Sequence, residues 1–198
     1  MAGVQPYYAH NAAALGQRYG SVAFEDVHGA VLDLLPPAPA KVLDVGAGTG
    51  RDAAALAARG YEVAAVEPVT ELRQVAQRLH PDANIRWVQD ALPDLSRPEG
   101  PFDLVLLSAV WMHLPPATRL RAMERLAALL AESGLLVVSL RRGEPPVDRV
   151  MFDVPAEEVV RDGERAGLHR VRVTEEGTDR LGRAEVWWQT AVLRKESR

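Results

Sequence analysis

The segment that most constrains the fold of this chain spans residues 41–51 and has the sequence KVLDVGAGTGR. Its first half is an apolar run typical of a buried parallel strand. Residues 52–59 are rich in alanine and leucine and predict a helix. In the connection between them, Gly46, Gly48 and Gly50 lack the β-carbons that would keep a small molecule away from the backbone. A strand and a helix joined in this way predict a ligand site at the carboxyl end of the strand.

A second apolar strand is expected at 61–66, and acidic residues stand near both strand ends. Asp44 lies two residues before the first glycine, where its carboxylate can meet a positive group. Glu67 is about 20 positions beyond that glycine, where a doubly wound fold places the acceptor for both ribose hydroxyls. The turn is G-x-G-x-G rather than the G-x-G-x-x-G of nicotinamide-binding domains, and the chain has no G-x-x-x-x-G-K-[ST] loop. These observations favour a nucleoside ligand without a pyrophosphate.

Further motifs follow in order along the chain. The segment at 42–68 is followed by IRWVQDA at 85–91 and FDLVLLSA at 102–109, and it is preceded by YAHNA at 8–12. Together these segments resemble the motifs of class I S-adenosylmethionine-dependent methyltransferases, and the resemblance covers nearly the whole chain. The YAHNA segment at 8–12 resembles the Y-D-x-x-A start of the small type 11 and type 12 members, although Ala9 stands in place of the Asp.

This resemblance implies S-adenosyl-L-methionine as the cofactor and S-adenosyl-L-homocysteine as its product. It implies that Asp44, Gly46 and the backbone near Ser108 hold the methionine end, and that Glu67 holds the ribose. The residues that it places at the cofactor are Tyr8, Arg18, Asp44, Gly46, Ala47, Gly48, Gly50, Glu67, Pro68, Asp90, Ala91 and Ser108.

The remaining assignments concern the adenine and the N-terminal segment. By the resemblance, Asp90 holds the adenine amino group and the backbone amide of Ala91 meets the ring. Arg18 is a candidate for the cofactor carboxylate, and Tyr8 for closing over the site. The chain is expected to be one methyltransferase domain over 1–198, with a helical lid at 1–36 and a Rossmann-like core at 37–198.

The fold class expected is α/β, with a Rossmann-like, doubly wound sheet of seven strands and helices on both faces. Helices are expected at 11–19, 24–35, 71–79, 115–131 and 155–167. The last two strands, about 169–175 and 185–194, are joined by a short glycine-containing loop, so they must pair antiparallel. The sheet is therefore predicted to be mostly parallel with one antiparallel strand, whereas a nicotinamide-binding domain ends with a parallel sixth strand.

Composition limits the other classes of function. The chain has no cysteine, which excludes disulfides, thiolate metal sites and a cysteine nucleophile. Its histidines are scattered without the spacing of metal ligands, so no metal is expected. A net charge of −4 argues against tight binding to nucleic acid. No apolar run approaches the roughly 18 residues of a membrane span, and no targeting segment is visible. We therefore expect a cytoplasmic protein, without membrane contact, that is a monomer or homodimer.

Residues after the fourth strand narrow the chemistry. The sequence at 108–111 is SAVW, not the [DNS]-P-P-[YFW] typical of enzymes that methylate base amines, and Ser108 replaces the Asp of metal-assisted catechol methylation. His113 can act as a general base for an oxygen or sulfur acceptor, or it can fix the turn that starts the next helix. Arg141 and Arg142, at the end of the fifth strand, can pair with a substrate carboxylate.

These observations predict an S-adenosylmethionine-dependent methyltransferase acting on a small molecule, with His113 as the candidate catalytic residue. Three alternatives stay open: a tRNA or DNA methyltransferase, a cofactor-binding protein without transferase activity, and a nicotinamide oxidoreductase. Trp187 and Trp188 are adjacent in a strand, so at most one of them can face the site. Asp52, in a first helical turn, is explained by the helix dipole.

Overall fold

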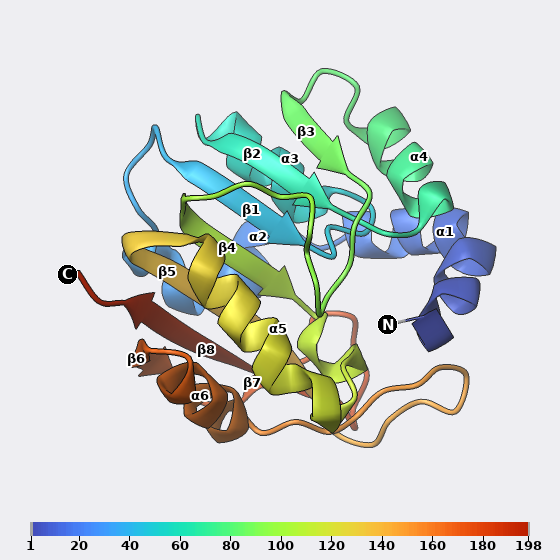
Figure 1. Cartoon of the computed structure of the whole chain (residues 1–198). Helices are drawn as coiled ribbons and strands as arrows, with labels where there is room; N and C mark the ends of the chain where they lie inside the picture. The colour runs from blue at the N-terminus through green and yellow to red at the C-terminus, as the bar shows by residue number, and fades with distance from the viewer. Residues whose placement is uncertain (1, 198) are drawn as a thin grey trace.

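The centre of the molecule is a sheet (Figure 1), seen in a computed structural model that describes residues 2–197. Its strands are β1 (Lys41–Val45), β2 (Glu62–Val66), β3 (Ile85–Val88), β4 (Phe102–Ser108), β5 (Leu130–Arg142), β6 (Leu168–Val173), β7 (Gly177–Thr178) and β8 (Trp187–Lys195). They lie in the order β3-β2-β1-β4-β5-β8-β6, and β7 pairs with β8. β1 is parallel to β2 and β4, whereas β8 is antiparallel to β5 and β6. The expected mostly parallel sheet with an antiparallel C-terminal strand is confirmed, and the short β7 adds an eighth strand.

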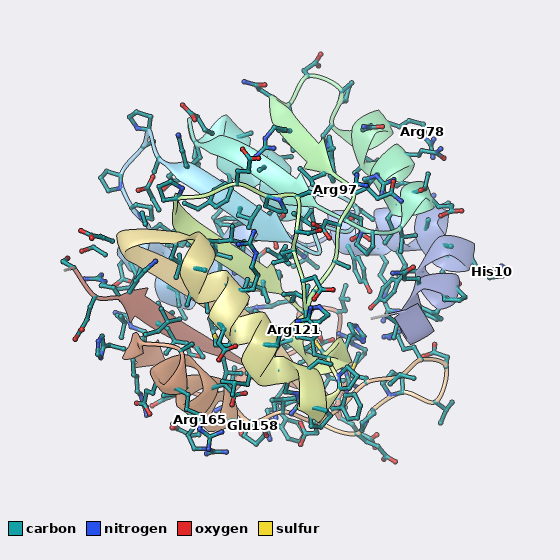
Figure 2. All side chains as sticks on the ribbon, in the orientation of Figure 1. His10, Arg78, Arg97, Arg121, Glu158 and Arg165 are labelled. Carbon is teal, nitrogen blue, oxygen red and sulfur yellow. The ribbon has the colours of Figure 1, made fainter. Side chains whose placement is uncertain are left out.

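Helices cover both faces of this sheet. They are η1 (Ala2–Val4), α1 (Gln5–Gly20), α2 (Phe24–His28), η2 (Gly29–Leu34), α3 (Arg51–Ala58), α4 (Thr70–Leu79), η3 (Trp111–His113), α5 (Pro116–Leu129) and α6 (Ala156–Arg165). α5 and α6 lie in front of the sheet in Figure 1, and α2 and α3 lie behind it. Arg78, Arg121 and Arg165 project into solvent from α4, α5 and α6 (Figure 2). Within residues 2–197, no helix has the length and apolar character needed to cross a membrane.

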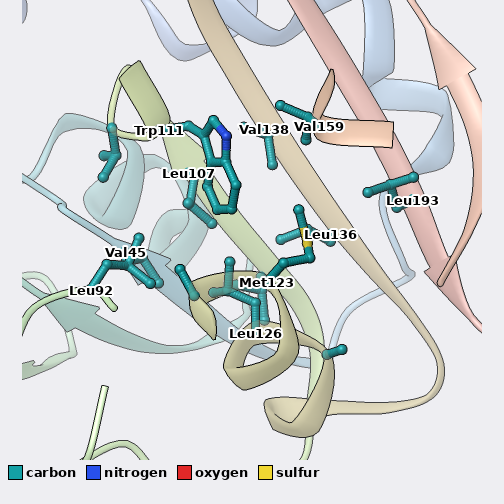
Figure 3. Close-up of a cluster of buried hydrophobic side chains, with 14 of the residues drawn as sticks. Val45, Leu92, Leu107, Trp111, Met123, Leu126, Leu136, Val138, Val159 and Leu193 are labelled. Atoms are coloured by element: carbon teal, nitrogen blue, oxygen red, sulfur yellow. The ribbon is translucent and has the colours of Figure 1, made fainter. Parts of the chain in front are cut away.

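Two apolar layers lie on opposite faces of the sheet. Successive residues of a strand point to opposite faces, so Leu43 packs in the layer under α5 and Val42 packs in the layer under α3. Figure 3 shows the first layer, in which Trp111 and Met123 are fully buried. Truncating a buried Trp typically costs roughly 3–5 kcal/mol. Because Trp111 begins η3, its burial anchors the short turn that also carries His113.

Element boundaries differ from the sequence expectation at three places. α1 begins six residues earlier than expected, with Pro6 in its first turn. Backbone N–H groups in the first turn have no partner within the helix, and proline, which has no N–H, is therefore favourable there. The segment 24–35 divides into an α-helix and a 3-10 helix at Gly29. The helix expected over 115–131 ends at Leu129, and β5 begins at the next residue with a register shift in its pairing to β4.

Candidate active site

A cavity of about 450 Å³ lies at the carboxyl ends of the parallel strands. In Figure 1 the arrows of β1, β2 and β4 point toward the side on which α1 lies. Ligand pockets are typically roughly 300–1,000 Å³, so the volume suits a small organic ligand. Strand ends, the N-terminal helix, η3, the loop after β5 and the C-terminal hairpin all contribute, and the side chains include Tyr8, Tyr19, Asp44, Arg51, Glu67, Ser108, Met112, His113, Arg141, Arg149, Met151, Arg183 and Trp188.

The glycine turn forms one wall of the cavity with bare backbone. Gly46 has φ +72°, and a β-carbon there would lie 2.5 Å from the Cγ2 atom of Val110, so a side chain is excluded. Gly48 has φ +56°, and the nearest heavy atom to a β-carbon there would be a carbonyl oxygen at 3.9 Å. Glycine is therefore required at 46 by space and conformation, and at 48 by conformation. The open space beside Gly48 leaves room for a ligand against the backbone.

Glu67 is held at the end of β2 by two backbone amides. Its Oε2 accepts the N–H of Gly48 at 2.9 Å, and its Oε1 accepts the N–H of Val69 at 2.9 Å. Burial raises the pKa of Glu67, and these two hydrogen bonds partly offset that effect. Each carboxylate oxygen has a second lone pair. The side chain is therefore oriented in advance and can still accept two hydroxyl groups.

One carboxylate oxygen of Asp44, at the end of β1, lacks a hydrogen-bond donor within residues 2–197. Its side chain is 1% exposed and lines the cavity. Its Oδ2 has no hydrogen-bond partner among the residues that the structure describes. Burial, together with the negative charge of Asp52, raises the pKa of Asp44 well above its ordinary value. A positively charged ligand group beside Asp44 would supply the missing partner.

Asp52 is the centre of a buried ion cluster, and the helix dipole alone does not explain it. Its Oδ2 lies 3.1 Å from Nε2 of His28, and its Oδ1 accepts the Nε–H of Arg51 at 2.6 Å. Burial by itself would raise the pKa of Asp52, but the bonds to His28 and Arg51 outweigh it and lower the pKa. Asp52 therefore stays ionised close to Asp44.

We expect Asp44→Asn to stabilise the ligand-free protein. In the unfolded chain this carboxyl titrates near pH 4, whereas its folded pKa is raised. The folded state therefore holds the proton more strongly, and stability falls as pH rises from about 4 to the raised value. Asparagine removes that cost, so the melting temperature at pH 7 should rise by about 2–4 °C. Thermal unfolding measured from pH 3.5 to 8 should show the difference vanish below about pH 4, and equal melting at pH 7 would contradict this account.

Tyr8 and His113, both expected at the site, meet in the cavity. The Nδ1 of His113 lies 2.9 Å from the carbonyl oxygen of Val150, which can only accept, so Nδ1 carries the proton. Burial lowers the pKa of His113, so the ring is neutral near pH 7 and its Nε2 is an acceptor. The Tyr8 hydroxyl donates to that Nε2 at 2.9 Å. His113 thus presents a proton-accepting nitrogen to the cavity, and a main-chain carbonyl fixes its tautomer.

Comparisons with known proteins agree with this geometry. Residues 42–134 match the family model described as a methyltransferase domain. Over 108 residues, which are 52% of this chain and 46% of the relative, the sequence is 38% identical to the protein-L-isoaspartate O-methyltransferase of Dechloromonas aromatica. Together, the family model, the curated methyltransferases and the solved methyltransferase structures support a class I S-adenosylmethionine-dependent methyltransferase. The chain spans less than half the length of such curated relatives: 46% of the Dechloromonas aromatica protein and 40% of an uncharacterized methyltransferase of Mycobacterium bovis.

Solved methyltransferases share the whole fold. A TehB-like S-adenosylmethionine-dependent methyltransferase from Corynebacterium glutamicum is 22% identical, with 96% of this chain and 100% of that chain covered and a TM-score of 0.74. The Burkholderia thailandensis 1,6-didemethyltoxoflavin-N1-methyltransferase, solved with S-adenosylhomocysteine bound, is 22% identical, with 93% and 89% covered and a TM-score of 0.65. At these identities the likeness is one of fold.

The cofactor of this methyltransferase family, S-adenosylmethionine, fits the residues present. It carries ribose hydroxyls, an amino group and a positively charged sulfur, and the wall of the cavity offers Glu67, the orphaned Oδ2 of Asp44 and an open glycine backbone. Of the residues that the sequence places at the cofactor, those that line the cavity are Tyr8, Asp44, Gly46, Ala47, Gly48, Glu67, Pro68 and Ser108. The rest, which are not among its lining residues, are Arg18, Gly50, Asp90 and Ala91.

Asp90 and Ala91, the residues predicted to contact the adenine, are hydrogen-bonded to each other in this structure. Asp90 Oδ1 accepts the N–H of Ala91 at 2.8 Å, and Asp90 Oδ2 accepts the N–H of Arg97 at 2.7 Å. The carboxylate therefore closes the loop 90–97 instead of facing the cavity. Neither residue is among those that line the cavity, and the adenine role that the motif implies stays a prediction.

Arg18 is also not among the residues that line the cavity. Its side chain is exposed, whereas Tyr8 and Tyr19 of the same helix line the cavity. Successive helix residues differ by 100° in direction, so Arg18 cannot share the inward direction of Tyr19.

Gly50, with φ +80°, turns the chain into α3.

Several cavity residues were not predicted from the sequence. Tyr19, Arg149 and Arg183 line the cavity but belong to no motif, and Arg51 ends the glycine motif without a role predicted for its side chain. Arg149 lies in an irregular loop, where no periodicity signals direction. Of the adjacent tryptophans, Trp188 lines the cavity. Successive side chains of a strand point to opposite faces, so at most one of the two can do so.

We expect α1 to become more ordered when the cofactor binds. The helix packs mainly on α4, through Leu15 and its neighbours, and its Tyr8 and Tyr19 cover the cavity. A helix with so few neighbours depends on a ligand for part of its burial. Hydrogen exchange should show stronger protection of residues 5–20 with S-adenosylhomocysteine than without it. Equal protection in the two states would contradict a lid role.

Proposed function

We propose that this protein transfers a methyl group from S-adenosylmethionine to a small-molecule nucleophile. The observation that carries the proposal is that one cavity joins the carboxylates of Asp44 and Glu67 to the proton-accepting Nε2 of His113. The carboxylates suit the cofactor, and the imidazole suits an acceptor that loses a proton as it attacks. The position of His113 at the end of β4 supports placing the acceptor there.

The cofactor, when bound, supplies a methyl group on a positively charged sulfur that is already a good leaving group. Glu67 would hold the ribose hydroxyls, and Asp44 the positive methionine end. Tyr8 and Tyr19 of α1 would cover the cavity and exclude water. Most of the rate gain would come from holding the two reactants in line.

His113 is the residue that can accept a proton. Its Nδ1–H is held by the Val150 carbonyl, so the lone pair of Nε2 points along the direction now taken by the Tyr8 hydroxyl. When the acceptor binds, its O–H, N–H or S–H would replace the Tyr8 hydroxyl as the donor to Nε2. The proton moves to Nε2 as the acceptor atom attacks, and His113 becomes an imidazolium. General bases of this kind typically contribute about 100- to 10,000-fold.

The cavity and surface support a small acceptor over a nucleic acid. The 450 Å³ must hold the cofactor and the acceptor together, which leaves room for a compact molecule. The net charge is −4, and the exposed Arg78, Arg121 and Arg165 project from three different helices, α4, α5 and α6 (Figure 2). A nucleic-acid surface would require clustered positive charge.

A binding assay followed by an acceptor screen tests the proposal. Thermal shift should show stabilisation by S-adenosylhomocysteine and none by a nicotinamide dinucleotide. The screen, with S-adenosylhomocysteine release as readout, should then identify small acceptors. Failure to bind S-adenosylhomocysteine would overturn the proposal. Binding without turnover on any acceptor would indicate a cofactor-binding protein, and turnover only on salt-sensitive tRNA or DNA complexes would indicate a nucleic-acid methyltransferase.

A further inference from the structure

Two arginines in the cavity have guanidinium nitrogens without partners. Arg141, at the end of β5, is 9% exposed, and the side chain of Arg149, in the loop that follows, is 10% exposed. Both line the cavity. Within the part of the chain that the structure describes, the Nε of each is buried and has no hydrogen-bond partner. Burying such donors is costly unless something satisfies them.

The charge of Arg149 is only weakly balanced. Its guanidinium lies over the ring of Tyr7, 4.6 Å from the centroid, and its Nη1 is 3.4 Å from Asp148 Oδ1, a long contact. The next residue, Val150, gives the carbonyl that holds His113. Arg149 therefore lies beside the proposed base.

Arg141 is held in place by neutral groups. Its Nη1 donates to the carbonyl oxygens of Gly143 at 3.2 Å and Glu144 at 2.9 Å. Burial, together with the positive charges of Arg183 and Arg149, lowers the pKa of Arg141, and the negative charges of Asp179 and Asp153 only partly offset this effect.

Neighbouring arginines differ, because each has a close carboxylate. Arg142 donates to Asp153 at 2.6 Å, and Arg183 donates to Asp179 at 2.6 Å. Among the described arginines at this end of the cavity, Arg141 and Arg149 thus differ in having no carboxylate at short hydrogen-bond distance. The structure keeps these two cations partly desolvated in one cavity, an arrangement that an anionic ligand would stabilise.

We propose that Arg141 and Arg149 bind an anionic group of the methyl acceptor, a carboxylate or a comparable oxyanion. This inference rests on the proposed function and names the class of substrate. A guanidinium can bind such a group through two parallel hydrogen bonds. Met112, Met151 and Trp188 line the same cavity and offer an apolar surface for the body of the acceptor. The acceptor is then a small organic acid whose nucleophilic atom reaches His113.

The test uses the full-length protein saturated with S-adenosylhomocysteine. Binding is measured for benzoate, phenylacetate and 4-hydroxybenzoate, each against its primary amide, with sulfate and phosphate as a separate arm. We expect acids to bind better than amides by about tenfold or more, and Arg149→Gln and Arg141→Gln to remove that preference. Arg149→Lys, which keeps the charge but loses the planar fork, should retain part of it. Arg142→Gln is the matched control. Because Arg142 is already paired with Asp153, this variant should keep the full preference.

The outcomes separate this inference from the proposed function. If the wild-type protein binds S-adenosylhomocysteine but shows no preference for acids over amides, only the anion site is overturned. If it binds sulfate or phosphate but no organic acid, the site takes inorganic oxyanions. If Arg149→Gln loses S-adenosylhomocysteine but keeps 5′-methylthioadenosine, which lacks the amino-acid end, the arginine holds the cofactor carboxylate, and the proposal is wrong. Melting temperatures of all variants confirm that each is folded.

Discussion

Replacing His113 with glutamine should slow methyl transfer by about 100- to 10,000-fold once an acceptor is known. Glutamine can still donate a hydrogen bond to the Val150 carbonyl, but it has no nitrogen that takes up a proton near neutral pH. Single-turnover rates at saturating cofactor and acceptor measure the chemical step. A loss below tenfold, with cofactor affinity and melting temperature intact, would rule out the base. A lower melting temperature with an unchanged rate in the folded fraction would assign His113 to the fold.

The pH profile provides a second readout of His113. Burial lowers its pKa below the ordinary value of about 6.5. The neutral ring is then lost only as the pH falls through that lowered value. The wild-type rate should be constant above about pH 6.5 and decline below it, and the His113→Gln variant should lack this decline. Tyr8→Phe removes the hydroxyl that now contacts Nε2 and is the matched control, because it should keep the decline.

Glu67→Ala should weaken S-adenosylhomocysteine binding about ten- to a hundredfold. Hydrogen bonds from two ribose hydroxyls to a carboxylate contribute on the order of 1.5–3 kcal/mol, and alanine removes both acceptors. The variant also leaves the N–H groups of Gly48 and Val69 without their partner, so we expect a lower melting temperature as well. Titration calorimetry on the folded variant separates the two effects. Glu62→Ala, an exposed position on the same strand, is the control, and unchanged affinity for Glu67→Ala would place the ribose elsewhere.

The parts of the fold and site that the sequence predicts are those encoded locally. The strand, glycine turn and acidic residue at 42–67 are contiguous, and the C-terminal hairpin follows from two strands with a short connection, so both were correctly expected. The place of Asp90 depends on which donors its loop presents, and the loop amides capture its carboxylate. The direction of Arg18 could not be read from the sequence for a different reason, because it depends on which face of α1 packs on α4.

Residues brought in by tertiary packing left no sequence signal. Arg149 is 36 positions from His113, in a loop whose path is set by main-chain bonds, such as that from Phe152 N–H to the Met112 carbonyl. No periodicity or motif encodes that approach. The orphaned nitrogens of Arg141 and Arg149 are likewise visible only once the cavity is built.

The Val150 carbonyl has a consequence for how acceptor range can change. Because the group that orients His113 belongs to the main chain, substitutions in the loop 143–151 can alter what the cavity accepts while the imidazole keeps its tautomer. Insertions and deletions differ, since a shift of one residue would move that carbonyl away from Nδ1. Diversification of this protein, in nature or by directed evolution, should therefore proceed through loop composition at constant loop length.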